Sequence, residues 1–216
     1  MAHRALIEHR PWLMVSLIAG IAYYFLSGDA NESIWQILLK GAGVGLLAVY
    51  AFQRTSGVDG AILTLALALS AAADMVLVIR FEVGGALFFA SHVVAIFLYL
   101  RNRRSETTPS QKLCAAALFL GTPAVAYLLS GRADIALYSA SLGAMAAAAW
   151  MSRFPRYRVG LGAVLFIISD WLIFSRMGAL NLAPVPDLLV WPTYFAAQIM
   201  IATGVVQTLR GERPAA

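Results

Sequence analysis

The sequence VDGAILTLALALSAAADMVLVI, residues 58–79, is a continuous apolar segment with the length and composition of a transmembrane helix. An α-helix of ~20 mostly apolar residues crosses the ~30 Å hydrocarbon layer of a membrane. The apolar residues are consecutive here, whereas the strands of a membrane barrel alternate apolar and polar residues. Asp74 stands out inside this segment, because removing a carboxylate from water is costly unless a partner compensates it.

The rest of the chain has the same apolar character. Of its 216 residues, 61% are hydrophobic and 12% are charged, and the mean hydropathy is +0.76. These values exceed the apolar content of a soluble domain. We therefore expect an all-α, polytopic transmembrane helical bundle of about eight spans, forming a single integral membrane domain over residues 1–216. The expected spans are residues 12–27, 33–53, 58–79, 84–100, 112–130, 134–152, 158–177 and 188–209.

The distribution of positive charge predicts the orientation of these spans. With eight spans, both termini lie on the same side of the membrane as the loops after the second, fourth and sixth spans. The cations on that side are Arg4, Arg10, Arg54, Arg101, Arg103, Arg104, Lys112, Arg153, Arg156, Arg158, Arg210 and Arg213. The opposite side carries only Arg80, Arg132 and Arg176. The positive-inside rule then places both termini in the cytoplasm, and we expect a bacterial inner membrane protein. The net charge of +5 therefore requires no nucleic-acid partner.

The two halves of the chain share a short motif. SAAADMVLVIR (70–80) and FIISDWLIFSR (166–176) both place an aspartate six residues before an arginine. The basic loop at 101–112 separates four expected spans on either side. This pattern suggests a parallel repeat of four plus four helices.

Four ionisable residues remain inside the expected spans after the loop charges are assigned. They are Lys40, Asp74, His92 and Asp170. Ionisable groups inside a membrane are expensive and usually mark a functional site. A helix rises 1.5 Å per residue, so all four lie roughly 7–12 Å from the outer ends of their spans.

Three further polar residues extend this layer. Tyr138 lies roughly 6 Å, Tyr194 roughly 10 Å and Gln198 roughly 16 Å from the outer end. In TYFAAQ (193–198) the tyrosine and the glutamine are four residues apart and share one helix face. We therefore expect a polar cavity in the outer half of the membrane, lined from the second, third, fourth, sixth, seventh and eighth spans. The tryptophans, Trp191 among them, lie mostly near span ends, as interfacial anchors do.

Two carboxyl groups, one lysine and one histidine are suited to general acid–base catalysis, with one aspartate as acid and the other as anion. A catalytic zinc needs three protein ligands, and the chain has one buried histidine and no H-x-x-x-H pair. No G-x-S-x-G motif is present. We therefore expect an enzyme that uses neither a metal nor a cofactor.

Two other roles for the buried residues are open at this point. The aspartates could be structural, either bonding neighbouring helices or pairing with Lys40. A small-molecule or proton-coupled transporter could use the same Lys, Asp and His residues as a proton relay.

Together, several segments resemble the YhhN-like lysoplasmalogenase family of eight-span membrane proteins. The resemblance rests on LLKGAGVGLLAVYA (38–51), SAAADMVLVIRFEVGGALFFASHVVAIFLYL (70–100), LYSASLGAMAAAA (137–149), VLFIISDWLIFSRMG (164–178) and WPTYFAAQIMIATG (191–204). One departure is Ala73, where the family usually has glycine before the aspartate.

The resemblance implies a membrane hydrolase that cleaves the vinyl ether bond of a lysoplasmalogen or a related lysophospholipid. The products would be a fatty aldehyde and a glycerophosphoethanolamine or glycerophosphocholine. On this reading Asp74 and Asp170 are the catalytic acid and anion, and Lys40 binds the phosphate. His92, Tyr194 and Gln198 position water or the glycerol hydroxyl, and Tyr138 contributes to substrate binding.

Overall fold

Eight α-helices account for most of the residues that the computed structural model describes, which are 11–27, 32–180 and 182–211. The helices are α1 (Pro11–Leu26), α2 (Ile34–Arg54), α3 (Gly57–Ile79), α4 (Phe81–Arg101), α5 (Pro109–Ser130), α6 (Ala133–Met151), α7 (Leu161–Ser175) and α8 (Val185–Gly211). A π-helical turn, η2 (Arg156–Gly160), leads directly into α7. The described residues form no strand, and the all-α prediction is confirmed.

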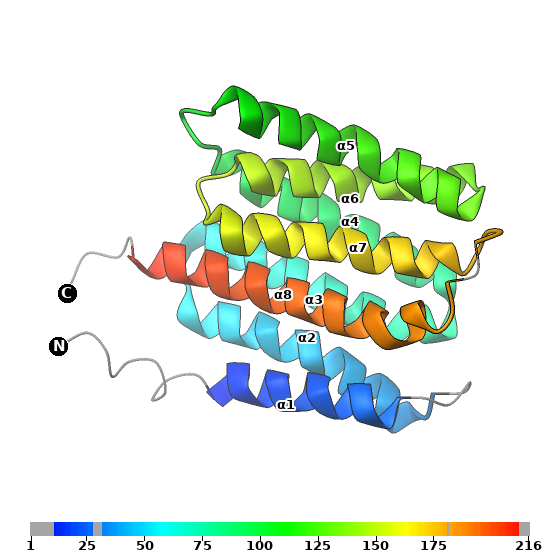
Figure 1. Ribbon diagram of the computed structural model, residues 1–216. Helices are drawn as coiled ribbons and strands as arrows, with labels where there is room; N and C mark the ends of the chain where they lie inside the picture. Colours follow the sequence, from blue (N-terminus) through cyan, green and yellow to red (C-terminus); the bar gives the residue numbers. More distant parts are fainter. Residues whose placement is uncertain (1–10, 28–31, 181, 212–216) are drawn as a thin grey trace.

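Six of these helical segments are long and apolar enough to cross a membrane: α2, α3, α4, α5, the η2–α7 unit and α8. The apolar helix α1 is shorter, with 16 residues. The helices lie side by side in one bundle, with α1 and α5 at its two edges (Figure 1). The chain is thus an integral membrane protein by the length and composition of its helices.

Both chain termini, expected in the cytoplasm, lie outside the described residues. The first and last described residues, Pro11 and Gly211, lie at the same end of the bundle (Figure 1). The loops that follow α2, α4 and α6 also lie there (Figure 1). We call this the basic end, because many of the arginine and lysine residues of the chain lie in or next to these loops. At this end Arg101 forms a 3.0 Å ion pair with Asp59, and the backbone N–H of Arg153 donates to the carbonyl of Asn102 at 2.8 Å.

Helix caps explain why several helices differ from the expected ranges. Helix α5 begins at Pro109 rather than at residue 112, because Thr108 and Gln111 form a capping box and proline suits the first helical position. Helix α2 begins at Ile34 behind the equivalent box of Ser33 and Gln36. The polar residues of the capping boxes therefore set where these two helices begin.

Helices α3 and α4 have the shortest link between two α-helices in the described chain. Only Arg80 separates Ile79 from Phe81. The turn brings Gly84 against the backbone of Leu77, where an added Cβ would lie 2.5 Å from the Leu77 Cα. The absence of a side chain at Gly84 thus permits the close approach of the helices that carry Asp74 and His92.

Adding a methyl group at Gly84 should therefore destabilise the protein. We expect Gly84→Ala to cost about 1–3 kcal/mol of stability, because the overlap forces the backbone of α3 or α4 to move. Thermal unfolding of the purified protein in detergent measures this as a lower melting temperature.

Gly85 is the matched control, because a Cβ at this neighbouring position meets no atom within 4 Å. Gly85→Ala should unfold at or slightly above the wild-type temperature. Equal losses in the two alanine variants would contradict the close approach.

Candidate active site

A cavity of about 730 Å³ opens at the end of the bundle opposite the basic end. We call it the polar cavity, since charged and hydroxyl-bearing side chains from α1, α2, α3, α7, α8 and their loops line it. They are Tyr23, Tyr24, Ser27, Glu32, Lys40, Asp74, Ser169, Asp170, Arg176, Asp187 and Tyr194. Four of the residues predicted from the sequence, Lys40, Asp74, Asp170 and Tyr194, thus line one cavity.

Asp74 is held from the neighbouring helix α8. Its side chain is buried, and Oδ2 accepts a 2.8 Å hydrogen bond from the hydroxyl of Tyr194. The amide of Gln198, one turn further along α8, donates to the same tyrosine oxygen at 3.2 Å. Gln198 itself does not line the polar cavity but borders a small gap deeper in the bundle. It therefore acts on Asp74 through Tyr194.

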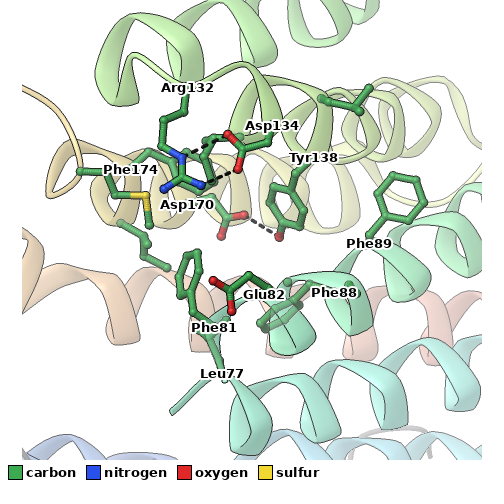
Figure 2. Close-up of a pocket in the computed structure, with 16 residues that line it drawn as sticks. Leu77, Phe81, Glu82, Phe88, Phe89, Arg132, Asp134, Tyr138, Asp170 and Phe174 are labelled. Carbon is green, nitrogen blue, oxygen red and sulfur yellow. Dashed lines mark hydrogen bonds and ion pairs between the residues drawn. The ribbon is translucent and has the colours of Figure 1, made fainter. Parts of the chain in front are cut away.

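Asp170 is held in the same manner by a different helix. Its Oδ2 accepts a 3.0 Å hydrogen bond from the hydroxyl of Tyr138 on α6. Tyr138 lines a second cavity of about 420 Å³, which we call the apolar pocket (Figure 2). Asp170 lines both cavities, whereas Asp74 lines only the polar cavity.

Lys40 pairs with Glu32, which lies just before α2 and outside the expected spans. Its Nζ lies 3.8 Å from Oε1 of Glu32 and 5.4 Å from the ring centre of Tyr23. The hydroxyl of Tyr23 donates to the same glutamate oxygen at 2.6 Å. Within the described chain, Lys40 therefore forms its ion pair with Glu32 and not with Asp74 or Asp170.

His92 lies behind the cavities rather than on their walls. It is fully buried among the rings of Phe88, Tyr138 and Phe166, with centroid distances between 5.2 and 6.4 Å. Its Nδ1 lies 3.1 Å from the hydroxyl oxygen of Ser141. The same hydroxyl donates to the Tyr138 carbonyl at 2.7 Å. Within the described chain, Nε2 has no hydrogen-bond partner.

The structure therefore differs from the expected arrangement in two ways. Instead of one cavity lined from six helices, two cavities share Asp170: Lys40, Asp74 and Tyr194 line the polar cavity, and Tyr138 lines the apolar pocket. His92 and Gln198 line neither of these two cavities, so their roles in catalysis stay predictions.

Several residues that line the polar cavity are not predicted from the sequence, among them Tyr23, Glu32 and Trp191. The expectation that Trp191 anchors the protein at the interface is wrong, since it is buried and its indole N–H donates to the Gly20 carbonyl at 2.8 Å. The position of Tyr23 could have been found from the sequence. It lies four residues from the end of its expected span, which is roughly 6 Å from the outer end.

The partners of the two aspartates do not follow the proposed repeat. A four-plus-four repeat equates α3 with α7 and α8 with α4, so the partner of Asp170 would come from α4. It comes instead from α6. The repeat stays a prediction.

Comparison with protein families gives one match. Residues 35–205 match the model of the YhhN family. No curated protein and no solved structure matches the chain.

Removing the hydroxyl of Tyr194 should destabilise the bundle. We expect Tyr194→Phe to cost about 1–2 kcal/mol, because Asp74 and Gln198 each lose a buried hydrogen bond between or within helices. Thermal unfolding in detergent measures the effect.

Tyr50→Phe is the matched control. The Tyr50 hydroxyl is buried and has no hydrogen-bond partner among the described residues, so its removal should leave the unfolding temperature unchanged or raised. A larger loss for Tyr50→Phe than for Tyr194→Phe would contradict the proposed support of Asp74.

Proposed function

The chain belongs to the YhhN family, and from this membership we propose that it is a membrane hydrolase that cleaves the vinyl ether bond of a lysoplasmalogen or related lysophospholipid. The products are a fatty aldehyde and a glycerophospho-alcohol. We further propose that it acts in a bacterial inner membrane, with the polar cavity in the outer half. The observation that carries the proposal is that Lys40, Asp74 and Asp170 line one cavity at one end of an apolar bundle.

Vinyl ether hydrolysis needs few chemical groups. A protonated acid transfers its proton to the β-carbon of the double bond, which leaves an oxocarbenium ion on the ether side. An anion stabilises this cation. Water then adds to the cationic carbon and gives one proton to the carboxylate left by the acid, which forms a neutral hemiacetal and regenerates the acid. Collapse of the hemiacetal transfers a proton to the glycerol oxygen and releases the aldehyde. Two carboxyl groups can supply the acid and the anion.

We assign these two roles to Asp74 and Asp170. Both are buried, and each accepts a hydrogen bond from a tyrosine hydroxyl that fixes its carboxyl group in place. A fixed carboxyl group does not have to reorganise while charge develops on the substrate, which is the basis of electrostatic catalysis. Which aspartate is the acid is left open by this assignment.

Lys40 is our candidate for binding the substrate phosphate. It lines the polar cavity and is one of its two cations, with Arg176. Arg176 is already paired with Asp187 at 2.7 Å, whereas the Lys40–Glu32 pair is longer, at 3.8 Å. A phosphate at Lys40 therefore competes with the weaker of the two ion pairs.

Neutralising either aspartate should abolish turnover. We expect Asp74→Asn and Asp170→Asn each to lower turnover by at least about 100-fold, the usual contribution of a general acid or base. Aldehyde release from a lysoplasmalogen by the purified protein in detergent measures it.

Asp59→Asn is the matched control, because Asp59 lies at the basic end, paired with Arg101 and Asn102. Its turnover should stay close to wild type. Full turnover by either test variant removes that carboxylate from the mechanism. No aldehyde from the wild type with any ether lysolipid contradicts the hydrolase and favours the transporter.

Heavy water tests the chemical step itself. Because the proton that reaches the β-carbon comes from an exchangeable carboxyl group, the aldehyde formed in deuterium oxide should carry one deuterium next to the carbonyl carbon. Immediate reduction to the alcohol followed by mass spectrometry measures it. Unlabelled aldehyde added to the enzyme in deuterium oxide corrects for later exchange, and a product without carbon-bound deuterium overturns the mechanism.

A further inference from the structure

The apolar pocket has the size and lining of a lipid-chain site. Its volume of about 420 Å³ falls within the range of ~300–1,000 Å³ typical of ligand pockets. The walls are mostly aromatic and aliphatic, and Figure 2 shows the rings of Phe81, Phe88 and Phe174 around the space next to Asp170. Such a surface binds hydrocarbon and offers little to a charged group.

Exposed apolar side chains form part of the pocket wall. Phe81, Phe89 and Leu137 line the pocket and are 39%, 43% and 73% exposed. These residues come from the N-terminal halves of α4 and α6. In a membrane-embedded bundle, apolar side chains exposed on the flank face the hydrocarbon of the bilayer. A chain can therefore enter from the bilayer without passing through water.

Apart from Asp170, the charged residues that line the pocket lie at the N-terminal ends of α4 and α6. Arg132 and Asp134 form two contacts with each other, at 2.6 and 3.1 Å, and are strongly exposed (Figure 2). Glu82 is also exposed. The interior of the pocket thus leaves Asp170 and the Tyr138 hydroxyl as its polar groups.

Asp170 stands where the two cavities meet. Leu77, Phe88 and Ile173 also line both cavities. A molecule with a charged head group and a single hydrocarbon chain can therefore place one part in each cavity. The bond between the two parts then lies beside Asp170.

We infer that the apolar pocket binds the aliphatic chain of the single-chain lipid substrate, while the head group occupies the polar cavity. The identity of the bond that is cleaved rests on the proposed function, but the chain site applies to any single-chain ether lysophospholipid. The chain moves from one apolar environment to another, so it is selected by fit more than by hydrophobic gain.

Gly85 offers a way to fill this pocket without disturbing the bundle. It lines the pocket, and a Cβ at this position meets no atom within 4 Å. Gly85→Leu therefore adds a branched side chain to empty space in the pocket. Gly121 on α5 is the matched control, because it also has open space around a Cβ but lines neither cavity.

The experiment compares octenyl and hexadecenyl lysoplasmalogens at equal surface concentration in nanodiscs. Overfilling an apolar site costs ~1–3 kcal/mol, so Gly85→Leu should lower the hexadecenyl-to-octenyl ratio of kcat/KM by about tenfold or more. Gly121→Leu should keep the wild-type ratio. If Gly85→Leu does not fold, Ala86→Leu adds bulk to the same pocket from an exposed position.

A binding measurement separates the chain site from the reaction. The saturated octyl and hexadecyl ether analogues have no vinyl bond, and their dissociation constants follow from the thermal shift that they cause. A fall in the hexadecyl-to-octyl affinity ratio in Gly85→Leu supports the chain site even if the wild type cleaves neither lysoplasmalogen, a result that refutes only the proposed function. Unchanged kcat/KM and affinity ratios overturn the chain site while an active wild type upholds the proposed function.

Discussion

Two hydrogen bonds, from Tyr194 to Asp74 and from Tyr138 to Asp170, allow carboxyl groups to exist inside this apolar bundle. Without a partner, a buried carboxyl group costs several kcal/mol. Each bond also joins two helices, α8 to α3 and α6 to α7. The same two bonds therefore satisfy the buried carboxyl groups and hold the helices together. They also keep both aspartates at the wall of the polar cavity, where neither forms a closed ion pair.

The two cavities of the site differ in the chemistry of their linings. On one side lie Lys40, Glu32 and the Arg176–Asp187 pair, and on the other lie mostly aromatic and aliphatic side chains. Asp170, Phe88 and Leu77 line both cavities. An amphipathic molecule meets matching surroundings at each of its ends, which orients it before any reaction.

The sequence was informative about position along each helix. Ionisable residues inside continuous apolar runs can be recognised directly, and the fixed rise of a helix gave each of them a depth. This placed Lys40, Asp74, Asp170 and Tyr194 together correctly. The eight helices followed from the same apolar runs.

Rotation about the helix axis could not be predicted in this way, because it depends on packing between helices. His92 faces Phe166 and Ser141 behind the cavities. Gln198 likewise faces the interior. Glu32 lies outside the expected spans, and its contact with Lys40 depends on packing at the end of the bundle. The division into two cavities depends on where Phe88 and Leu77 pack.

The single-residue link between α3 and α4 has a consequence for biosynthesis. Since one residue leaves no slack between α3 and α4, we expect the two helices to enter the membrane together as a hairpin. The hydroxyls of Ser70 and Ser91 bond across this hairpin at 2.8 Å, and Ser91 also donates to the carbonyl of Ala66. Asp74 therefore reaches the membrane interior alongside a helix that is already bonded to its own, long before Tyr194 has been synthesised.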